Sequence, residues 1–203
     1  EALHGDLGSK PFLLPYFNPA SPLVMNAGTT DKMETAIARG LPIIFSNYSM
    51  AGASTPLTPA GTLALLLAEL LAGLVITQAI QTGAPVLLGM LPVYFDMKSM
   101  LNFYDPQSVL VSLACAEMMA HYGVPHCSTS GSGTGWGMDL VAVDTYWMNT
   151  LSLLLTQSGL APFIGDSHGS KSISPCTVVH VHEVIDQAQR FAGVLPGSTS
   201  YRG

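Results

Sequence analysis

Charged residues are the scarcest component of this chain. They make up 10% of its 203 residues, whereas an average soluble domain contains about 25%. Lysine and arginine together number seven, and the net charge at pH 7 is −6. Because a protein that binds nucleic acid needs a basic face against the phosphates, we expect no nucleic-acid partner.

The low charge comes with a hydrophobic content of 48%, which indicates a chain that buries much of its surface. Three explanations stay open: the interior of a larger protein, large contacts with partners, or a membrane. Residues 62–80 approach the length of a spanning helix. However, Glu69 and Gln78 interrupt this run, and no basic clusters flank it. We therefore expect no membrane span. We also expect the protein to form a homo-oligomer.

Cysteine is also rare, and its three positions are Cys115, Cys127 and Cys176. An odd number without a CxxC pattern favours free thiols in a reducing compartment, so we expect a cytoplasmic protein. The sequence contains no HExxH, EF-hand or CxxC spacing, and we expect no metal site. The chain starts without Met or a signal peptide, so we expect it to begin inside a longer protein.

Short apolar runs alternate with helical segments along the chain. Continuous apolar runs are typical of parallel strands covered on both faces, and several of the helical segments end at a glycine. The predicted strands span residues 11–17, 41–45, 85–89, 124–128 and 160–165. The predicted helices span residues 30–39, 58–81, 106–122, 138–157 and 178–191. Five strand–helix units predict an α/β fold with a parallel sheet.

Two architectures fit such units: an open doubly wound sheet, or an arc of a (β/α)8 TIM-type barrel. Five units are too few to close an eight-stranded barrel. The barrel therefore requires that this chain is a fragment carrying about five βα units, or that the missing strands come from elsewhere. Since no linker or low-complexity segment is visible, we treat residues 1–203 as one partial domain.

Ligands bind at the carboxyl ends of the strands in both architectures. The loops that follow the predicted strands are longer and more polar than the opposite turns, which indicates a binding face. From loop position we assign Asp96 and His168 as candidate catalytic residues. Candidate substrate-binding residues are Asn18, Tyr94, Ser99 and Trp136.

Other features of these loops allow two interpretations each. The glycine-rich loop at residues 131–137 either holds an anion with its backbone amides or is simply flexible. Trp136 either walls a pocket or packs under this loop. Aromatic residues gather near the strand ends, where they form a possible cation–π cage for a quaternary ammonium or ordinary rim packing. For Glu69 we favour a structural role, in which it pairs with a group on a neighbouring element. Within the same loop–helix segment, we therefore expect the loop at residues 51–59 to contact the ligand.

Several segments are similar to the trimethylamine methyltransferase family, whose members without pyrrolysine include glycine betaine:corrinoid methyltransferases. The most specific is MAGASTPLTPAGTLALLLAELLAG at residues 50–73. The others are NPASPL at 18–23, GLP at 40–42, TGAPVLLG at 82–89, DMKS at 96–99 and HYGVPHCSTSG at 121–131. The resemblance covers about residues 10–192.

This resemblance implies a (β/α)8 barrel of more than twice this length. It implies an enzyme that passes a methyl group from a methylated amine to the cobalt(I) of a separate corrinoid protein, as in methylamine metabolism and methanogenesis. The cobalamin-type corrinoid belongs to that partner, which docks over the barrel mouth. The work of such a protein is positioning and electrostatics, because the cobalt is the nucleophile.

This sequence departs from the family pattern in two places. No pyrrolysine is present, and the loop where we would expect it reads DSHGSKS at residues 166–172. A quaternary amine such as a betaine is therefore the favoured substrate. The family tends to have Asp-Met-Arg-Thr where this chain has DMKS at residues 96–99.

Two other functions remain open. One is a lyase or aldolase of the (β/α)-barrel type that uses the amine of Lys98. The other is a subunit without catalytic activity that binds amines.

Overall fold

The computed structural model describes residues 11–98, 100–103, 106–128, 135–156, 158–160, 164–167 and 171–194. It confirms the predicted α/β class with a parallel sheet. The parallel strands are β1 (Tyr16–Phe17), β2 (Ile43–Ala51), β3 (Val86–Asp96), β5 (His126–Ser128) and β6 (Gly159–Leu160). The helices are α1 (Thr29–Ile37), α2 (Pro59–Ile80), α3 (Pro106–Tyr122), α4 (Leu140–Leu155) and α5 (Pro175–Val194).

Three further strands are short. Strand β4 (Leu101–Phe103) pairs antiparallel with the end of β3 and so forms a hairpin. Strands β7 (Asp166–Ser167) and β8 (Ser172–Ile173) pair with each other in a separate antiparallel ribbon.

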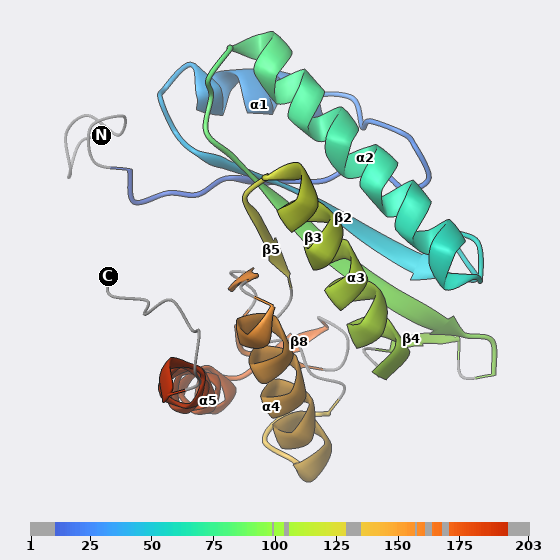
Figure 1. Cartoon of the computed structure of the whole chain (residues 1–203), viewed down its shortest axis with the longest axis vertical. Coiled ribbons are helices and arrows are strands. Elements are labelled where there is room, and N and C mark those ends of the chain that lie inside the picture. Colours follow the sequence, from blue (N-terminus) through green and yellow to red (C-terminus); the bar gives the residue numbers. More distant parts are fainter. Residues whose placement is uncertain are drawn as a thin grey trace.

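The order of the parallel strands in space, β1-β2-β3-β5-β6, is also their order in the chain. Crossovers between parallel strands are right-handed. A sheet that always advances in one direction therefore places its helices on one face, whereas a doubly wound sheet reverses direction and covers both. The described sheet is thus built from consecutive β/α units in the order that a barrel uses. In Figure 1, α2 and α3 run side by side across it.

The main core lies between the sheet and the first three helices. It contains Ile43 and Phe45 of β2, Leu88 and Met90 of β3, and side chains from α1, α2 and α3. Since side chains alternate along a strand, residues 44, 46 and 48 of β2 point to the opposite face. There, Ile44 and Cys127 form a small second cluster with Tyr16 and Leu87.

Helix α2 approaches the sheet closely because of Gly73. A Cβ atom at this position would overlap the ring of Phe45, which is fully buried in β2. Glycine usually weakens a helix interior by about 1 kcal/mol relative to alanine. Here it is the residue that allows helix and strand to pack.

We expect Gly73→Ala to lower the free energy of unfolding by about 1–3 kcal/mol, because the added methyl group overpacks the core. Gly193→Ala in α5 is the matched control, since a Cβ there meets no atom within 4 Å. That control should raise stability by about 0.5–1 kcal/mol through helix propensity alone. Urea unfolding of both variants measures the difference. Equal effects would show that α2 has room against β2.

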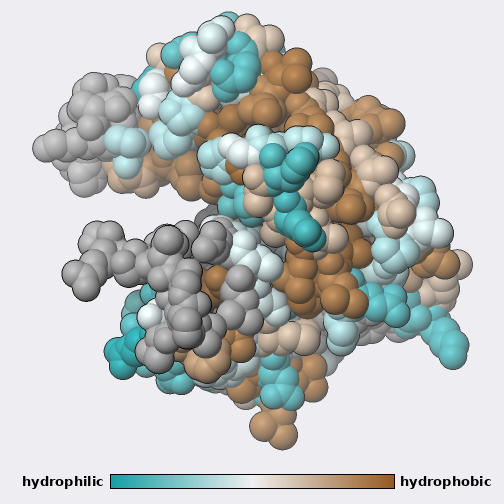
Figure 2. All heavy atoms as spheres, in the orientation of Figure 1, coloured by the Kyte–Doolittle hydropathy of each residue, from teal (hydrophilic) through white to brown (hydrophobic). Residues whose placement is uncertain are grey.

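Helix α2 has the length and apolar composition of a membrane span, and it alone does so among the described residues. Its inner side nevertheless packs into the core through Leu66, Leu70 and Gly73. In Figure 2 the surface over α2 and α3 is largely apolar, with Val75 and Leu110 among its exposed side chains. These contacts are those of a helix that covers a sheet.

The helices follow the sequence prediction closely, whereas the strands do not. The first strand was predicted to begin at Pro11, but β1 begins at Tyr16; the fifth was predicted over residues 160–165, but β6 spans Gly159–Leu160. Helix α2 lies within one residue of its predicted bounds at each end, but α5 begins three residues earlier than predicted, at Pro175. The predicted ends of the second and third strands, at Phe45 and Gly89, are wrong. Strand β2 continues to Ala51 and β3 to Asp96, in register with each other.

The described cysteines are free, and two of them are buried. Burial raises the pKa of both Cys115 and Cys127 to about 12. A thiol with such a pKa carries almost no thiolate at neutral pH and is a poor nucleophile. Both therefore act as small apolar core residues, as the sequence suggested.

Candidate functional site

The parallel strands end at very different heights along the sheet. Phe17, the last residue of β1, is level with Phe45, which is level with Leu88 of β3. Strands β2 and β3 continue for six and eight residues beyond that level, and the two-residue β1 and β6 do not follow them. The carboxyl end of the sheet is therefore a projecting β2-β3-β4 ribbon (Figure 1).

An apolar groove lies beside this ribbon, where β2 ends, between the first turns of α2 and α3. Its volume is about 290 Å³. The residues that line it are Pro59, Ala60, Leu63, Tyr94, Gln107, Leu110, Val111 and Ala114. Tyr94 thus lies on the helix-facing side of β3, and it supplies the aromatic ring of the groove.

Asp96 lies two residues after Tyr94, on the same face of β3, where the β3–β4 hairpin turns. Its Oδ1 accepts a hydrogen bond from the backbone N–H of Lys98 at 3.2 Å, and its carbonyl accepts one from that of Met100 at 2.8 Å. The carboxylate of Asp96 therefore stabilises the hairpin turn. Lys98 is exposed at the tip, which is unlike the desolvated pockets that activate Schiff-base lysines.

Trp136 precedes α4 and is 79% exposed. Its backbone N–H donates to Oδ2 of Asp139 at 2.8 Å, and Oδ1 of Asp139 accepts from Ala142 N–H at 2.9 Å. These two hydrogen bonds, that of Ala142 foremost, hold the pKa of Asp139 below its ordinary value. Trp136 is consequently exposed beside a helix N-cap, and it is not among the residues that line the groove at Tyr94.

The remaining candidates do not gather around the groove. Asn18 follows β1, so it lies about seven residues, or about 23 Å along the strands, from the level of Asp96. One small molecule cannot touch both. Ser99, His168 and most of the glycine-rich loop lie outside the described residues. Within the described residues, no three His, Cys, Asp or Glu side chains cluster as a metal site would require.

The buried polar centre of the chain is Glu69, which is 3% exposed in the middle of α2. Its Oε2 accepts hydrogen bonds from Ser21 Oγ at 2.7 Å and from Asn47 Nδ2, and its Oε1 accepts one from Leu23 N–H. Ser49 in turn donates to Oδ1 of Asn47. An ionised carboxylate is an acceptor with room for several donors. The structure thus supports a structural role for Glu69.

The strand residues that bind this carboxylate were predicted to lie in a loop. Asn47 and Ser49 are fully buried in β2, although polar residues at these positions suggested a loop. Both side chains point to the helix side of β2, where the carboxylate of Glu69 accepts from Asn47 and Asn47 accepts from Ser49. The sequence signal for these partners is Glu69 itself, because an acid inside an apolar helix needs hydrogen-bond donors, and alternate polar residues after a neighbouring strand can supply them.

We expect Glu69→Gln to destabilise the protein by about 1–3 kcal/mol, because the new amide cannot accept from every donor and leaves a buried one unpaired. Glu117→Gln, at an exposed position on α3, is the matched control and should change stability by less than about 0.5 kcal/mol. Thermal and urea unfolding measure both. If Glu69→Gln behaved like the control, the three hydrogen bonds would not hold the loop.

Consecutive β/α units with a groove at the carboxyl end of the sheet define an α/β protein of the kind that binds small molecules there. The family model of trimethylamine methyltransferase (MTTB) matches residues 3–164. The chain therefore belongs to this family.

Curated relatives agree with this assignment. The chain is 35% identical over 125 residues to a glycine betaine methyltransferase of Desulfitobacterium hafniense (strain Y51), which is 61% of this chain and 26% of the relative. It is 32% identical over 117 residues to the trimethylamine methyltransferase MttB of Methanosarcina barkeri (strain Fusaro / DSM 804), which is 57% of this chain and 24% of the relative. The matched region spans about a quarter of each relative.

Proposed function

We propose that this chain is part of a methyltransferase that moves a methyl group from a tertiary or quaternary amine to the cobalt of a corrinoid protein. The family match over residues 3–164 carries the proposal. In such a reaction, the bond between methyl carbon and nitrogen would break with its electron pair left on nitrogen. The partner's corrinoid, as cobalt(I), would supply the electron pair that accepts the methyl group, and a betaine-like substrate would leave as an amine with one methyl group fewer.

The consecutive order of the parallel strands supports a barrel as the architecture of the whole protein. Strands β1 and β6 are the two edges of the described sheet, and each is two residues long. We infer that the remaining strands of a (β/α)8 barrel pair with these edges. The chain spans only a quarter of its relatives' length, which leaves ample sequence for them.

The groove at Tyr94 lies on the helix side of the sheet and not on the face that a closed barrel would enclose, and its apolar lining with one aromatic ring fits a methylated ammonium group. Such a cation has methyl groups instead of hydrogen-bond donors, so an apolar groove with one aromatic ring suits it. A volume of about 290 Å³ accommodates a molecule the size of betaine. The carboxylate of Asp96, on the same face of β3, adds negative charge near the groove. In this role Tyr94 binds and Asp96 orients the cation.

A partner protein would bring the corrinoid, and exposed apolar side chains at this end of the sheet offer it a contact surface. Met97 and Met100 are exposed at the tip of the β3–β4 hairpin. Trp136, Leu140 and Val141 are exposed at the start of α4. Methionine is common on protein-binding surfaces because its side chain adapts to the partner.

The test is an assay of the full-length protein with its corrinoid protein and a panel of amines. We expect loss of one methyl group from a quaternary or tertiary amine, measured by chromatography of the amine and by the absorbance change of the corrinoid. A mixture without the corrinoid protein is the control. If no methylated amine loses a methyl group, the proposal fails. Binding without transfer would instead favour an amine-binding subunit.

If Tyr94 binds the ammonium group, Tyr94→Leu should weaken substrate binding about 3–30-fold, which corresponds to a cation–π contribution of about 0.5–2 kcal/mol. Tyr94→Phe keeps the ring and should lose much less. Tyr122→Leu, at an exposed position at the end of α3, is the matched control. Calorimetric titration with the amine measures all three. Equal binding by Tyr94→Leu and the wild type would exclude the groove as the amine site.

A further inference from the structure

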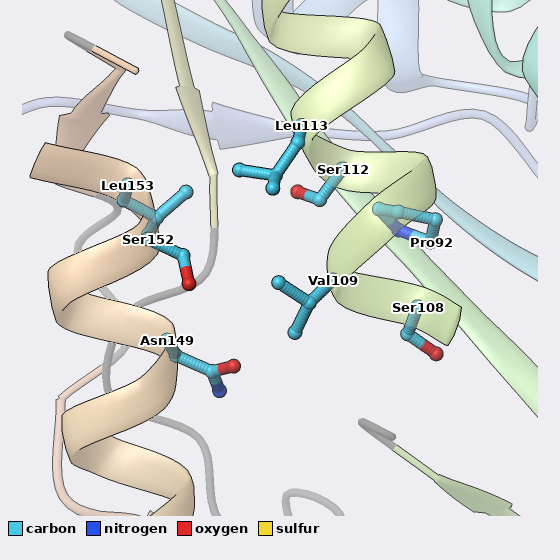
Figure 3. A pocket seen from close by; sticks show the side chains of 8 residues that line it. All are labelled: Pro92, Ser108, Val109, Ser112, Leu113, Asn149, Ser152 and Leu153. Atoms are coloured by element: carbon cyan, nitrogen blue, oxygen red, sulfur yellow. The ribbon is translucent and has the colours of Figure 1, made fainter. Parts of the chain in front are cut away.

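A small cavity lies between α3 and α4, away from the groove at Tyr94. Its volume is about 20 Å³. Pro92 of β3 lies at one side, and the other lining residues are Ser108, Val109, Ser112, Leu113, Asn149, Ser152 and Leu153. Figure 3 shows Asn149 and Ser152 of α4 directed into the space that faces Ser112 and Val109 of α3.

Asn149 brings an unsatisfied donor to this cavity. Its side chain is 5% exposed, and its Nδ2 has no hydrogen-bond partner among the described residues. A buried amide donor without a partner costs about 1–3 kcal/mol. Such groups are usually satisfied by protein or by an ordered water molecule.

Ser112 brings an acceptor, and the direction of its hydrogen bond follows from its neighbours. Ser128 Oγ donates to the carbonyl of Met90 at 3.0 Å, because a carbonyl can only accept. The hydrogen bond between Ser112 and Ser128 must then run from Ser112 to Ser128. Ser112 Oγ has used its proton and keeps lone pairs that can accept.

Ser152 is in the same state. Its hydroxyl donates to the carbonyl of Met148 one turn earlier in α4, at 2.6 Å. Its lone pairs are left to accept a hydrogen bond from the cavity side. The cavity therefore presents one amide donor from Asn149 and two hydroxyl acceptors, one from each helix.

We propose that this cavity is a binding site for one ordered water molecule that bridges α3 and α4. The water accepts a hydrogen bond from Asn149 Nδ2 and donates its two protons to Ser112 Oγ and Ser152 Oγ. Buried waters typically make about three hydrogen bonds, and about 10–15 Å³ of such space is enough for one. Donors, acceptors and size all match a single water.

The lining excludes larger or charged occupants. Among the described residues it contains no charged or aromatic side chain that could balance an ammonium group, so these residues do not form a second site for the methylated amine. Its size excludes any molecule much larger than water. The bridge joins the third and fourth β/α units through polar contacts, and it is independent of the proposed activity.

Magnetic relaxation dispersion of water nuclei counts long-lived buried waters and provides the test. The count for the full-length protein should fall by one in Asn149→Leu, because leucine removes the donor and fills the space. Asn26→Leu, at an exposed loop position, is the matched control and should leave the count unchanged. An equal count in wild type and Asn149→Leu would overturn the proposal.

A crystal structure of the wild-type protein at about 1.8 Å resolution gives a second measurement that does not depend on any variant folding. We expect a density peak within hydrogen-bond distance of Asn149 Nδ2, Ser112 Oγ and Ser152 Oγ. A cavity without a peak, or an Asn149 amide bonded to another protein group, would contradict the inference.

Discussion

The carboxylate of Glu69 is the interaction on which the arrangement of the first two β/α units depends. Helix α2 is otherwise apolar, so hydrophobic burial alone would let it slide or rotate on the sheet with little penalty. One acid with three donors removes that freedom. Asn47 fixes the helix against β2, and Ser21 with Leu23 fixes the loop after β1 against the helix. Gly73, one turn further on, then lets the ring of Phe45 reach the helix backbone. A directional contact and a steric one thus define a position that apolar packing leaves open.

The same contact explains why β2 is longer than its apolar run. Buried Asn47 and Ser49 would break a strand packed against a purely apolar helix, because their polar groups would lack partners. With Glu69 opposite them they extend the strand instead, and β3 follows β2 in register to Tyr94. The buried acid thus provides partners for the polar residues in the extended part of β2, which pairs with β3 up to Tyr94 at the groove. Two of the segments that resemble the family, residues 50–73 and 18–23, are in contact through this carboxylate.

The fold was largely predictable from the sequence, because helices with capping residues and glycine stops leave local signals. Thr58 caps α2 and Asp139 caps α4, and the predicted helix starts at residues 58 and 138 lie within two residues of the observed ones. The strand ends were not predictable in this way, since the burial of Asn47 and Ser49 depends on a helix residue some twenty positions away. The candidate site was predictable only in part. Loop position suggested Tyr94 and Asp96, which do lie together, and it also suggested Asn18, which the short β1 places far below them. Position in a loop says nothing about how far each strand extends.

The scarcity of charge can now be assigned to particular surfaces. Helix α2 exposes alanine and valine along its outer side, with half-buried leucines between them, and exposed apolar residues continue onto α3 and the start of α4. Edges of a sheet are normally paired, covered or charged, yet β1 and β6 are short edge strands, and Phe12, Leu13 and Leu14 are exposed beside β1. The low charge of the sequence therefore corresponds to apolar surface on the outer sides of α2 and α3, at the start of α4 and beside β1.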